Sequence, residues 1–357
     1  MSRVYVCGLG TVSPAGWSLA AMRAALAKGE PLPIQPLERP GWEEPLRARL
    51  VPPATRLPFL AHPRLRRTSP ITHYAAAAAL EAVAVVRTNN ERNFRLGVIV
   101  CLQAGCVQYS YRFFDETLKD PATASPLLFP ETVFAAPASH VATLLENTPL
   151  VYTLAGDPAC FLQGIALGVQ WLEEQRVEAC VVIGAEETNW LLADALWHFE
   201  PQAVISAGAG AVCLSLDTAV SLGVELDAIT DPHTYTAQTN RTRAARLMRE
   251  QLPPALPTEL LCDGSSGSPR ADAPERAAWL DWTGPRLSPK RILGEGLMAA
   301  GAWQCVAACD AVARGPFAAA TVSLVGSNQQ AIGARFTCDK SRTVHLPARA
   351  QQSNIRA

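Results

Sequence analysis

The chain has 357 residues, of which 49% are hydrophobic and 18% charged, and its formal net charge is −1. This length is enough for a large core built from two domains or two fused halves. The near-neutral charge excludes a broad basic surface for nucleic acid or an anionic membrane. No apolar stretch reaches the roughly 20 residues of a transmembrane helix, and no secretory signal pattern opens the chain. We therefore expect a cytoplasmic protein.

The N-terminal segment reads as a buried strand over residues 3–10 followed by a helix over 18–29 that stops at a glycine. The stretch "GLGTVS" superficially matches a dinucleotide-binding loop. It lacks the third glycine, and no acidic residue follows a second strand at the proper distance. These glycines are better explained by strand-turn packing, and no cofactor is expected.

The following segments alternate between helices and strands. Residues 31–63 are proline-rich and read as irregular; the expected helices cover 71–86 and 297–315, and the expected strands cover 95–102, 177–187, 207–216, 223–231, 258–264 and 318–328. Most strands are apolar on both faces, which favours a mainly parallel sheet covered on both sides. The alternation of strands and helices repeats in the second part of the chain, which predicts two similar halves, 1–216 and 217–340. The residues 341–357 carry no such pattern and are expected to form a loose tail.

Ten cysteines are spread along the chain, and none belongs to a CxxC pair. Most lie in apolar segments, so buried, reduced thiols are expected. Cys305 and Cys309 share one helix face, but no nearby histidine completes a zinc site. The sequence therefore predicts no metal site.

Cys160 differs from the other cysteines because it follows a turn of small residues, "GDPAC", at the end of a strand. Apolar residues from Leu162 to Leu172 then recur at spacings of three and four, which predicts a helix. Cys160 would lie in its first turn, where free N–H groups and the helix dipole favour a thiolate. That position suits a catalytic nucleophile and equally an inert buried thiol.

Taken together, the order of these motifs resembles the β-ketoacyl synthases, the condensing enzymes of thiolase fold. The matching pieces include "VCGLGTVSPAG", "DPAC" before a helix, "VVIGAEE", "DGSSGSPRADAPE", "LGEGLMAAGAWQ" and "LVGSNQQ", spread over residues 3–336. The resemblance implies an α/β, thiolase-like fold of five αβαβα layers with two pseudo-repeated halves. It also implies a dimer that forms through the sheet edge near Cys160.

The resemblance also implies a set of site residues. In that family a cysteine carries the acyl chain, two histidines hydrogen-bond the malonyl thioester, and backbone N–H groups form an oxyanion hole. The cysteine corresponds to Cys160. The histidine positions are occupied by Asp263 and by Glu295, which follows a retained Lys290. His140 could line the cavity, although a structural role is preferred.

Two carboxyl groups in place of imidazoles change the expected chemistry. If Asp263 and Glu295 converge on Cys160, their charges disfavour the thiolate and repel a malonyl carboxylate or an enolate. An ionised carboxylate cannot donate a hydrogen bond, and losing one oxyanion donor costs ~10²–10³ in rate. Ordinary condensation by this chain alone is not expected. A protonated buried acid could still donate, or a carboxylate could act as general base at Cys160.

The resemblance accordingly implies a non-condensing, chain-length-factor-like subunit of fatty-acid or polyketide biosynthesis that pairs with an active ketosynthase. Such relatives commonly replace the cysteine, which this chain keeps. The alternative is a free-standing, Cys160-dependent acyltransferase, thioesterase or unusual ketosynthase. In both cases the expected partners are an acyl carrier protein or a CoA thioester and a second subunit, in a homodimer or heterodimer, without nucleic acid or membrane.

Two departures from the family concern the cavity. The segment "TNWLLADALWHFEPQAV" is shorter than the usual cap, so one wall should be reduced or supplied by a partner. The loop "LVGSNQQ" keeps Gly326 and Asn328 but lacks the phenylalanine that gates acyl entry in the family.

Overall fold

The computed structural model describes residues 3–54, 57–89, 94–236, 238–315 and 317–338. The tail predicted over 341–357 lies outside these residues. The N-terminal half contributes five strands to the main sheet, in the spatial order β5-β4-β6-β8-β1. Its elements are β1 (Tyr5–Val12), α1 (Leu19–Lys28), α2 (Pro70–Asn89), β4 (Leu96–Leu102), α3 (Val107–Lys119), α4 (Ala136–Leu145), β5 (Leu150–Ala155), α5 (Cys160–Glu173), β6 (Ala179–Glu186), α6 (Trp190–Phe199) and β8 (Gly208–Ser215).

The C-terminal half continues the same sheet in the order β12-β11-β13-β14-β9. Its elements are β9 (Val224–Ile229), β10 (His233–Thr234), α7 (Arg241–Gln251), β11 (Glu259–Cys262), α8 (Pro269–Ala278), β12 (Arg286–Leu287), α9 (Pro289–Leu293), α10 (Met298–Ala313), β13 (Ala319–Val325) and β14 (Gln330–Cys338).

The two halves repeat one another strand by strand. The short strand β10 pairs with β14 outside this order. If the other main-sheet strands of each half are numbered in chain order, both halves read 3-2-4-5-1 across the sheet. The directions also agree, because β4 is parallel to β5 and β6 just as β11 is parallel to β12 and β13. Antiparallel pairing of β1 with β9 joins the halves. The predicted thiolase-like fold with a pseudo-repeat is confirmed.

Three apolar clusters separate the layers of this fold. The largest lies between the two halves of the sheet and contains helices α5 and α10. A second packs α2 and α4 on the outer face of the N-terminal strands. A third packs α7 and α8 on the outer face of the C-terminal strands. Residues of β4 alternate between the first two clusters, as expected of a strand covered on both faces.

The prediction of a mainly parallel sheet is wrong. The pairs β1/β8, β6/β8, β13/β14 and β9/β14 are antiparallel. Strands β13 and β14 are joined by a hairpin loop of a few residues, which is too short for the crossover that parallel neighbours require. Apolarity on both faces reports burial, which helices on both sides produce whatever the strand direction.

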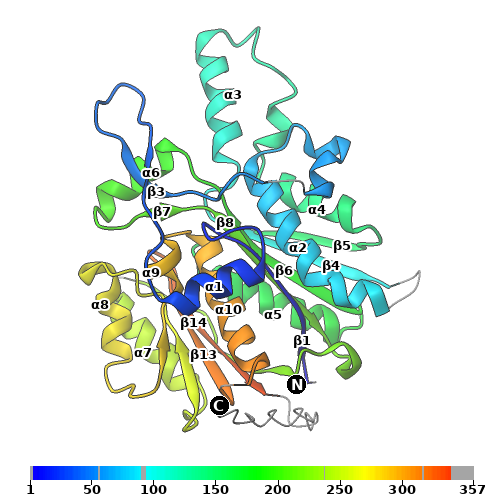
Figure 1. Cartoon of the computed structure of the whole chain (residues 1–357), viewed down its shortest axis with the longest axis vertical. Coiled ribbons are helices and arrows are strands. Elements are labelled where there is room, and N and C mark those ends of the chain that lie inside the picture. The colour runs from blue at the N-terminus through cyan, green and yellow to red at the C-terminus, as the bar shows by residue number, and fades with distance from the viewer. Residues whose placement is uncertain (1–2, 55–56, 90–93, 237, 316, 339–357) are drawn as a thin grey trace, which may run out of the picture.

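Two segments were not resolved by the sequence pattern. The proline-rich stretch contains β2 (Gln35–Leu37) and β3 (Leu46–Arg49), which form a small sheet with β7 (Ile205–Ser206). Helix α3 projects from the top of the molecule in Figure 1.

The "GLG" of β1 does have a packing role, because a Cβ on Gly8 would lie 1.7 Å from the carbonyl oxygen of Ala82 in α2.

Candidate functional site

Cys160 is the first residue of α5, as predicted, and its side chain is only 3% exposed. It belongs to the central apolar cluster. Its Sγ would lie 3.1 Å from a Cβ added to Gly156, so the turn before the helix needs glycine there. Burial, followed by the carboxylate of Asp157, raises the pKa of Cys160 to about 11. Both effects disfavour the thiolate, in contrast to the stabilisation expected from a helix N-terminus.

Asp157 fastens the start of α5 to the loop between β13 and β14. Its carboxylate accepts hydrogen bonds from the backbone N–H groups of Gln329 (3.0 Å) and Gln330 (3.3 Å). Its own N–H donates to Oε1 of Gln329 at 3.1 Å. A Cβ on Gly326 would lie 1.8 Å from Oδ2 of Asp157, so the loop requires glycine at this position. Sequence reasoning missed this role, although Asp157 stands inside the "GDPAC" turn.

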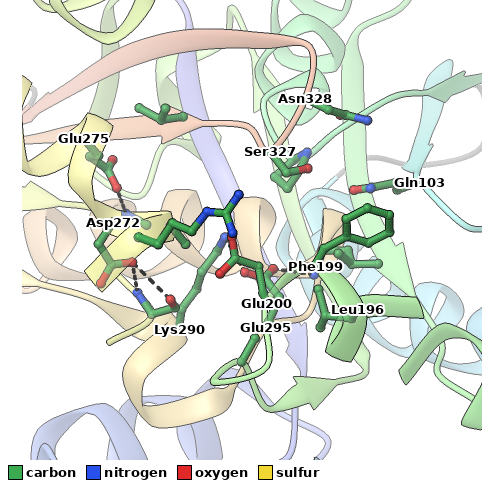
Figure 2. A pocket seen from close by; sticks show the side chains of 18 of the residues that line it. Gln103, Leu196, Phe199, Glu200, Asp272, Glu275, Lys290, Glu295, Ser327 and Asn328 are labelled. Atoms are coloured by element: carbon green, nitrogen blue, oxygen red, sulfur yellow. Dashed lines mark hydrogen bonds and ion pairs between the residues drawn. The ribbon is translucent and has the colours of Figure 1, made fainter. Parts of the chain in front are cut away.

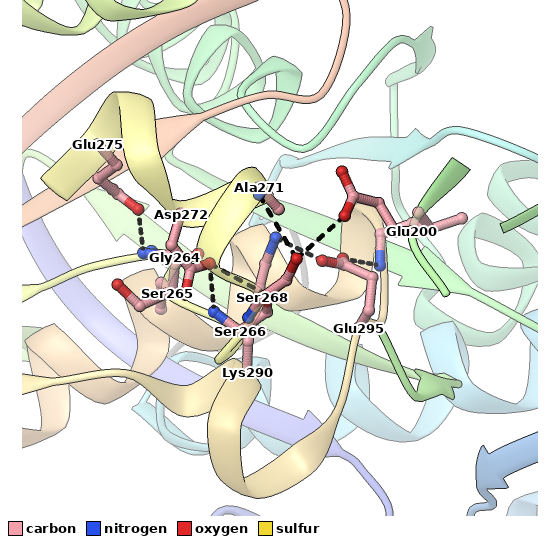
Figure 3. Close-up of polar contacts among 12 residues, drawn as sticks. Glu200, Gly264, Ser265, Ser266, Ser268, Ala271, Asp272, Glu275, Lys290 and Glu295 are labelled. Atoms are coloured by element: carbon pink, nitrogen blue, oxygen red, sulfur yellow. Dashed lines mark hydrogen bonds and ion pairs between the residues drawn. The ribbon is translucent and has the colours of Figure 1, made fainter. Parts of the chain in front are cut away.

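Lys290 and Glu295 are brought together, with Lys290 Nζ 2.8 Å from Oε2 of Glu295. Figure 3 shows this ion pair beside the loop that begins at Gly264. The other carboxylate oxygen of Glu295 accepts the N–H of Leu297 at 2.9 Å. Both side chains are largely buried, with exposures of 10% and 14%. Both oxygens of Glu295 thus accept hydrogen bonds, one from Lys290 and one from the backbone of Leu297.

Asp263 lies at the end of β11 and has different partners. Its carboxylate accepts the Ser288 hydroxyl at 2.5 Å and forms an ion pair with Arg286 at 3.4 Å. The carboxylate that raises the pKa of Cys160 is Asp157. Neither Asp263 nor Glu295 is among the groups that raise the pKa of Cys160. Catalytic roles for Cys160, Asp263, Glu295 and Lys290 remain predictions.

A further acid, Glu275 of α8, lies fully buried beside these groups. Its carboxyl group accepts the N–H of Gly264 at 2.9 Å and bonds to the hydroxyl of Ser323. Burial, and then the charge of Asp263, raises the pKa of Glu275 to about 8. Glu275 is therefore mostly a neutral carboxylic acid at pH 7.

Lys290, Glu295 and Glu275 border a cavity of about 590 Å³ (Figure 2), whereas Asp263 is not among its described lining residues. This volume is within the size range of small-molecule sites. One wall is apolar and comes from α6; the opposite wall carries Lys290, Glu275 and Glu295. Among the described lining residues the cavity includes Pro158 but not Cys160. The short cap segment contributes Leu192, Ala195, Leu196 and Phe199 to one wall of the cavity.

No histidine of the described residues lines this cavity. His140 instead places Nε2 3.0 Å from Oε1 of Glu131 on the neighbouring turn, which is the preferred structural role.

Within the described ranges, no group of three or more His, Cys, Asp or Glu side chains is arranged to hold a metal. None of the described helices combines the length and apolarity needed to cross a bilayer.

Comparison with known proteins identifies the fold. No protein-family model and no curated protein matches the sequence. Among solved structures, the ishigamide ketosynthase/chain length factor matches with a TM-score of 0.81 at 19% identity, over 94% of this chain and 99% of that chain. A β-ketoacyl synthase from Burkholderia phymatum matches with a TM-score of 0.81 at 16% identity, over 95% and 100% of the two chains. A ketosynthase in complex with its chain length factor from Xenorhabdus doucetiae matches with a TM-score of 0.76 at 14% identity, over 94% and 98%.

The chain thus has the thiolase-like fold of ketosynthases and chain length factors. The likeness extends over nearly the whole of each matched chain. At these low identities it establishes the fold, and the activity has to be argued from the site.

Proposed function

We propose that this protein is a non-condensing, chain-length-factor-like subunit that pairs with an active ketosynthase in fatty-acid or polyketide synthesis. One observation carries the proposal. The cavity has no imidazole among its described lining residues, and its polar wall presents a lysine-paired carboxylate, Glu295, where a condensing enzyme needs a hydrogen-bond donor.

The electrostatics of the site oppose condensation at two steps. With a pKa of about 11, Cys160 is ionised in only about one molecule in 10⁴ at pH 7, which leaves little nucleophile. An enolate formed on a malonyl thioester needs donors, and the carboxylate of Glu295 would repel it. The fold provides a cavity for an acyl group, but the site does not stabilise the negative charge that develops during carbon–carbon bond formation.

The pairing surface is the free edge of the N-terminal half. Strand β5 ends the sheet, so one side of its backbone has no neighbouring strand within the described chain. Val151 and Tyr152 on this strand are exposed. Such an edge can accept a strand of another subunit. Two of the matched structures are described as a ketosynthase with a chain length factor, which supports a partner of this kind.

Acyl groups would reach the pair on an acyl carrier protein or as CoA thioesters. A cytoplasmic location fits this role and is supported by the ten cysteines, all of which are free. Reduced thiols persist in reducing compartments.

Co-expression with an active ketosynthase and a carrier protein tests the proposal. We expect a stable one-to-one complex in which condensation requires the ketosynthase cysteine and is unaffected by Cys160→Ala in this chain. A Cys213→Ala variant is the matched control for loss of a buried thiol. Condensation by the isolated chain, abolished by Cys160→Ala alone, would refute the proposal.

One observation favours the alternative of a Cys160-dependent acyltransferase or thioesterase. Glu275 borders the cavity and its raised pKa of about 8 lets it hold at pH 7 a proton that an ordinary carboxylate lacks. On that hypothesis, intact-mass spectrometry after incubation with acyl-CoA shows an acyl adduct that is lost in Cys160→Ala and reduced in Glu275→Gln. Absence of any adduct eliminates it.

A further inference from the structure

The cavity bordered by Lys290 and Glu295 is separated from the thiol of Cys160. Its described lining includes Pro158 but no cysteine, and Cys160 is 3% exposed and packs in the central apolar cluster. A molecule that enters the cavity therefore meets no thiol at the described wall. The charges and apolar surfaces of that wall decide which chemistry the cavity binds.

One wall of the cavity is an apolar surface with an exposed aromatic ring. It comes from α6 and includes Leu196 and Phe199. Phe199 is 75% exposed although it borders the cavity. Figure 2 shows Phe199 and Leu196 across the cavity from Asp272 and Glu275. Covering such a ring with hydrocarbon is favourable, so this wall favours a ligand with an apolar chain.

The acids of the opposite wall already accept hydrogen bonds from the protein. Asp272 accepts two backbone N–H groups of the loop 264–268, at 2.8 and 2.9 Å. Glu275 accepts a third at 2.9 Å, and its pKa of about 8 leaves it mostly neutral at pH 7. Both oxygens of Glu295 are bonded, and Glu200 accepts a hydroxyl of the same loop at 3.1 Å (Figure 3). This wall therefore has little unused capacity to accept hydrogen bonds from a cation.

The unused hydrogen-bonding capacity of this wall lies in its arginines. Arg241, the first residue of α7, and Arg270 of α8 both border the cavity. Neither forms an ion pair with a residue that the structure describes. Nε of Arg241 is buried without a hydrogen-bond partner, and the guanidinium otherwise contacts two neutral oxygens, the hydroxyl of Tyr235 and, at 3.5 Å, the carbonyl of Ala271. A half-buried guanidinium with only neutral contacts is stabilised by an anion.

We infer that the cavity binds a free monocarboxylic acid with an aliphatic chain, with its carboxylate at Arg241 and its chain against α6. A carboxylate offers two oxygens to the planar donor edge of a guanidinium. One negative charge suits the site better than the two of a phosphate monoester, because each added charge is repelled by the carboxylates that border the same cavity, Glu200, Asp272 and Glu295. The site requires neither a thiol nor a partner subunit, so it goes beyond the function proposed above.

Calorimetric titration of the isolated chain with sodium octanoate tests the inference. We expect saturable binding of one octanoate, about 10-fold tighter than that of hexanoate because two more methylene groups are buried. Octanol and octylamine have the same chain without the negative charge, and they should bind at least about 10-fold more weakly. Octanol that binds as tightly as octanoate overturns the role of the arginine. Phosphopantetheine that binds more tightly than octanoate assigns the cavity to a phosphate and also overturns the inference.

Charge variants locate the carboxylate. Arg241→Gln should weaken octanoate binding at least about 10-fold, whereas Arg243→Gln, an exposed residue of the same helix outside the cavity lining, is the matched control and should change it less than about 2-fold. Arg270→Gln changes an exposed residue without disturbing the core and should weaken binding about 3-fold, while Glu200→Gln should tighten it by a similar factor.

The variants also separate this inference from the proposed pairing with a ketosynthase. Octanoate affinity that stays unchanged in both Arg241→Gln and Arg270→Gln overturns the carboxylate site. Weaker affinity in Glu200→Gln overturns it as well, because removing a negative charge cannot weaken a site for an anion. Co-expression with a ketosynthase measures pairing independently, so either function can fail while the other stands.

Discussion

Alkylation of Cys160 by iodoacetamide tests the electrostatics of the α5 N-terminus directly, because only the thiolate reacts. The pKa of about 11 lies about two units above the ordinary value of 9.0, so the thiolate is about 100-fold scarcer than in an unperturbed cysteine at pH 7.5. We expect labelling at least about 100-fold slower than that of a free cysteine, with a rate that rises tenfold per pH unit up to about pH 11.

The rate is followed by peptide mass spectrometry between pH 7 and 10. The exposed Cys338 reports in the same sample that the reagent is active, and Cys160→Ser assigns the signal. Removing the charge of Asp157 with Asp157→Asn should lower the pKa of Cys160 and speed labelling, while the effect of burial persists. A half-maximal rate below pH 8.5 in the wild-type chain would show that Cys160 is an activated nucleophile and would refute the reasoning.

Three further predictions concern stability, measured as the free energy of unfolding in denaturant. Lys290→Met leaves the carboxylate of Glu295 without its ion-pair partner and should cost about 3 kcal/mol, whereas adding Glu295→Gln should recover part of that loss; equal losses in the single and double variants would contradict this. Gly326→Ala forces a Cβ against Asp157 and should cost at least about 2 kcal/mol, with Ser327→Ala nearly neutral as the control. Glu275 keeps its proton in the folded chain up to about pH 8, but loses it near pH 4.5 when unfolded. Stability should therefore fall with rising pH between these values by up to about 1.4 kcal/mol per unit, and Glu275→Gln should remove this component; an unchanged pH profile would exclude it.

Much of the fold follows from the sequence because local signals agree with the tertiary structure. Helix α1 ends at Gly29, which has the left-handed conformation, as its sequence predicts. The position of Cys160 at the start of α5 follows from the apolar spacing of that helix. The repeat was visible because both halves place their strands in the same order along the chain.

Other features depend on contacts that leave no local pattern. Strand direction was mispredicted because burial on both faces is independent of it. Helix α3 is an exception: it was not predicted, although the helical spacing of Val107, Tyr111, Phe114 and Leu118 could have revealed it. In the site, Lys290 and Glu295 are close together in the sequence, but Asp157 and Gln329 are 172 residues apart. No residue pattern in either of these two segments indicates that they contact one another.

The internal repeat has a consequence for how this site could change during evolution. Helices α5 and α10 occupy corresponding places in the two halves, and each is preceded within two residues by one that borders the cavity, Pro158 before α5 and Leu297 before α10. The first residue of one helix is Cys160 and that of the other is Met298. Both halves thus contribute lining residues at corresponding places, so a substitution of Cys160 at the start of α5 would leave the lining of the cavity unchanged.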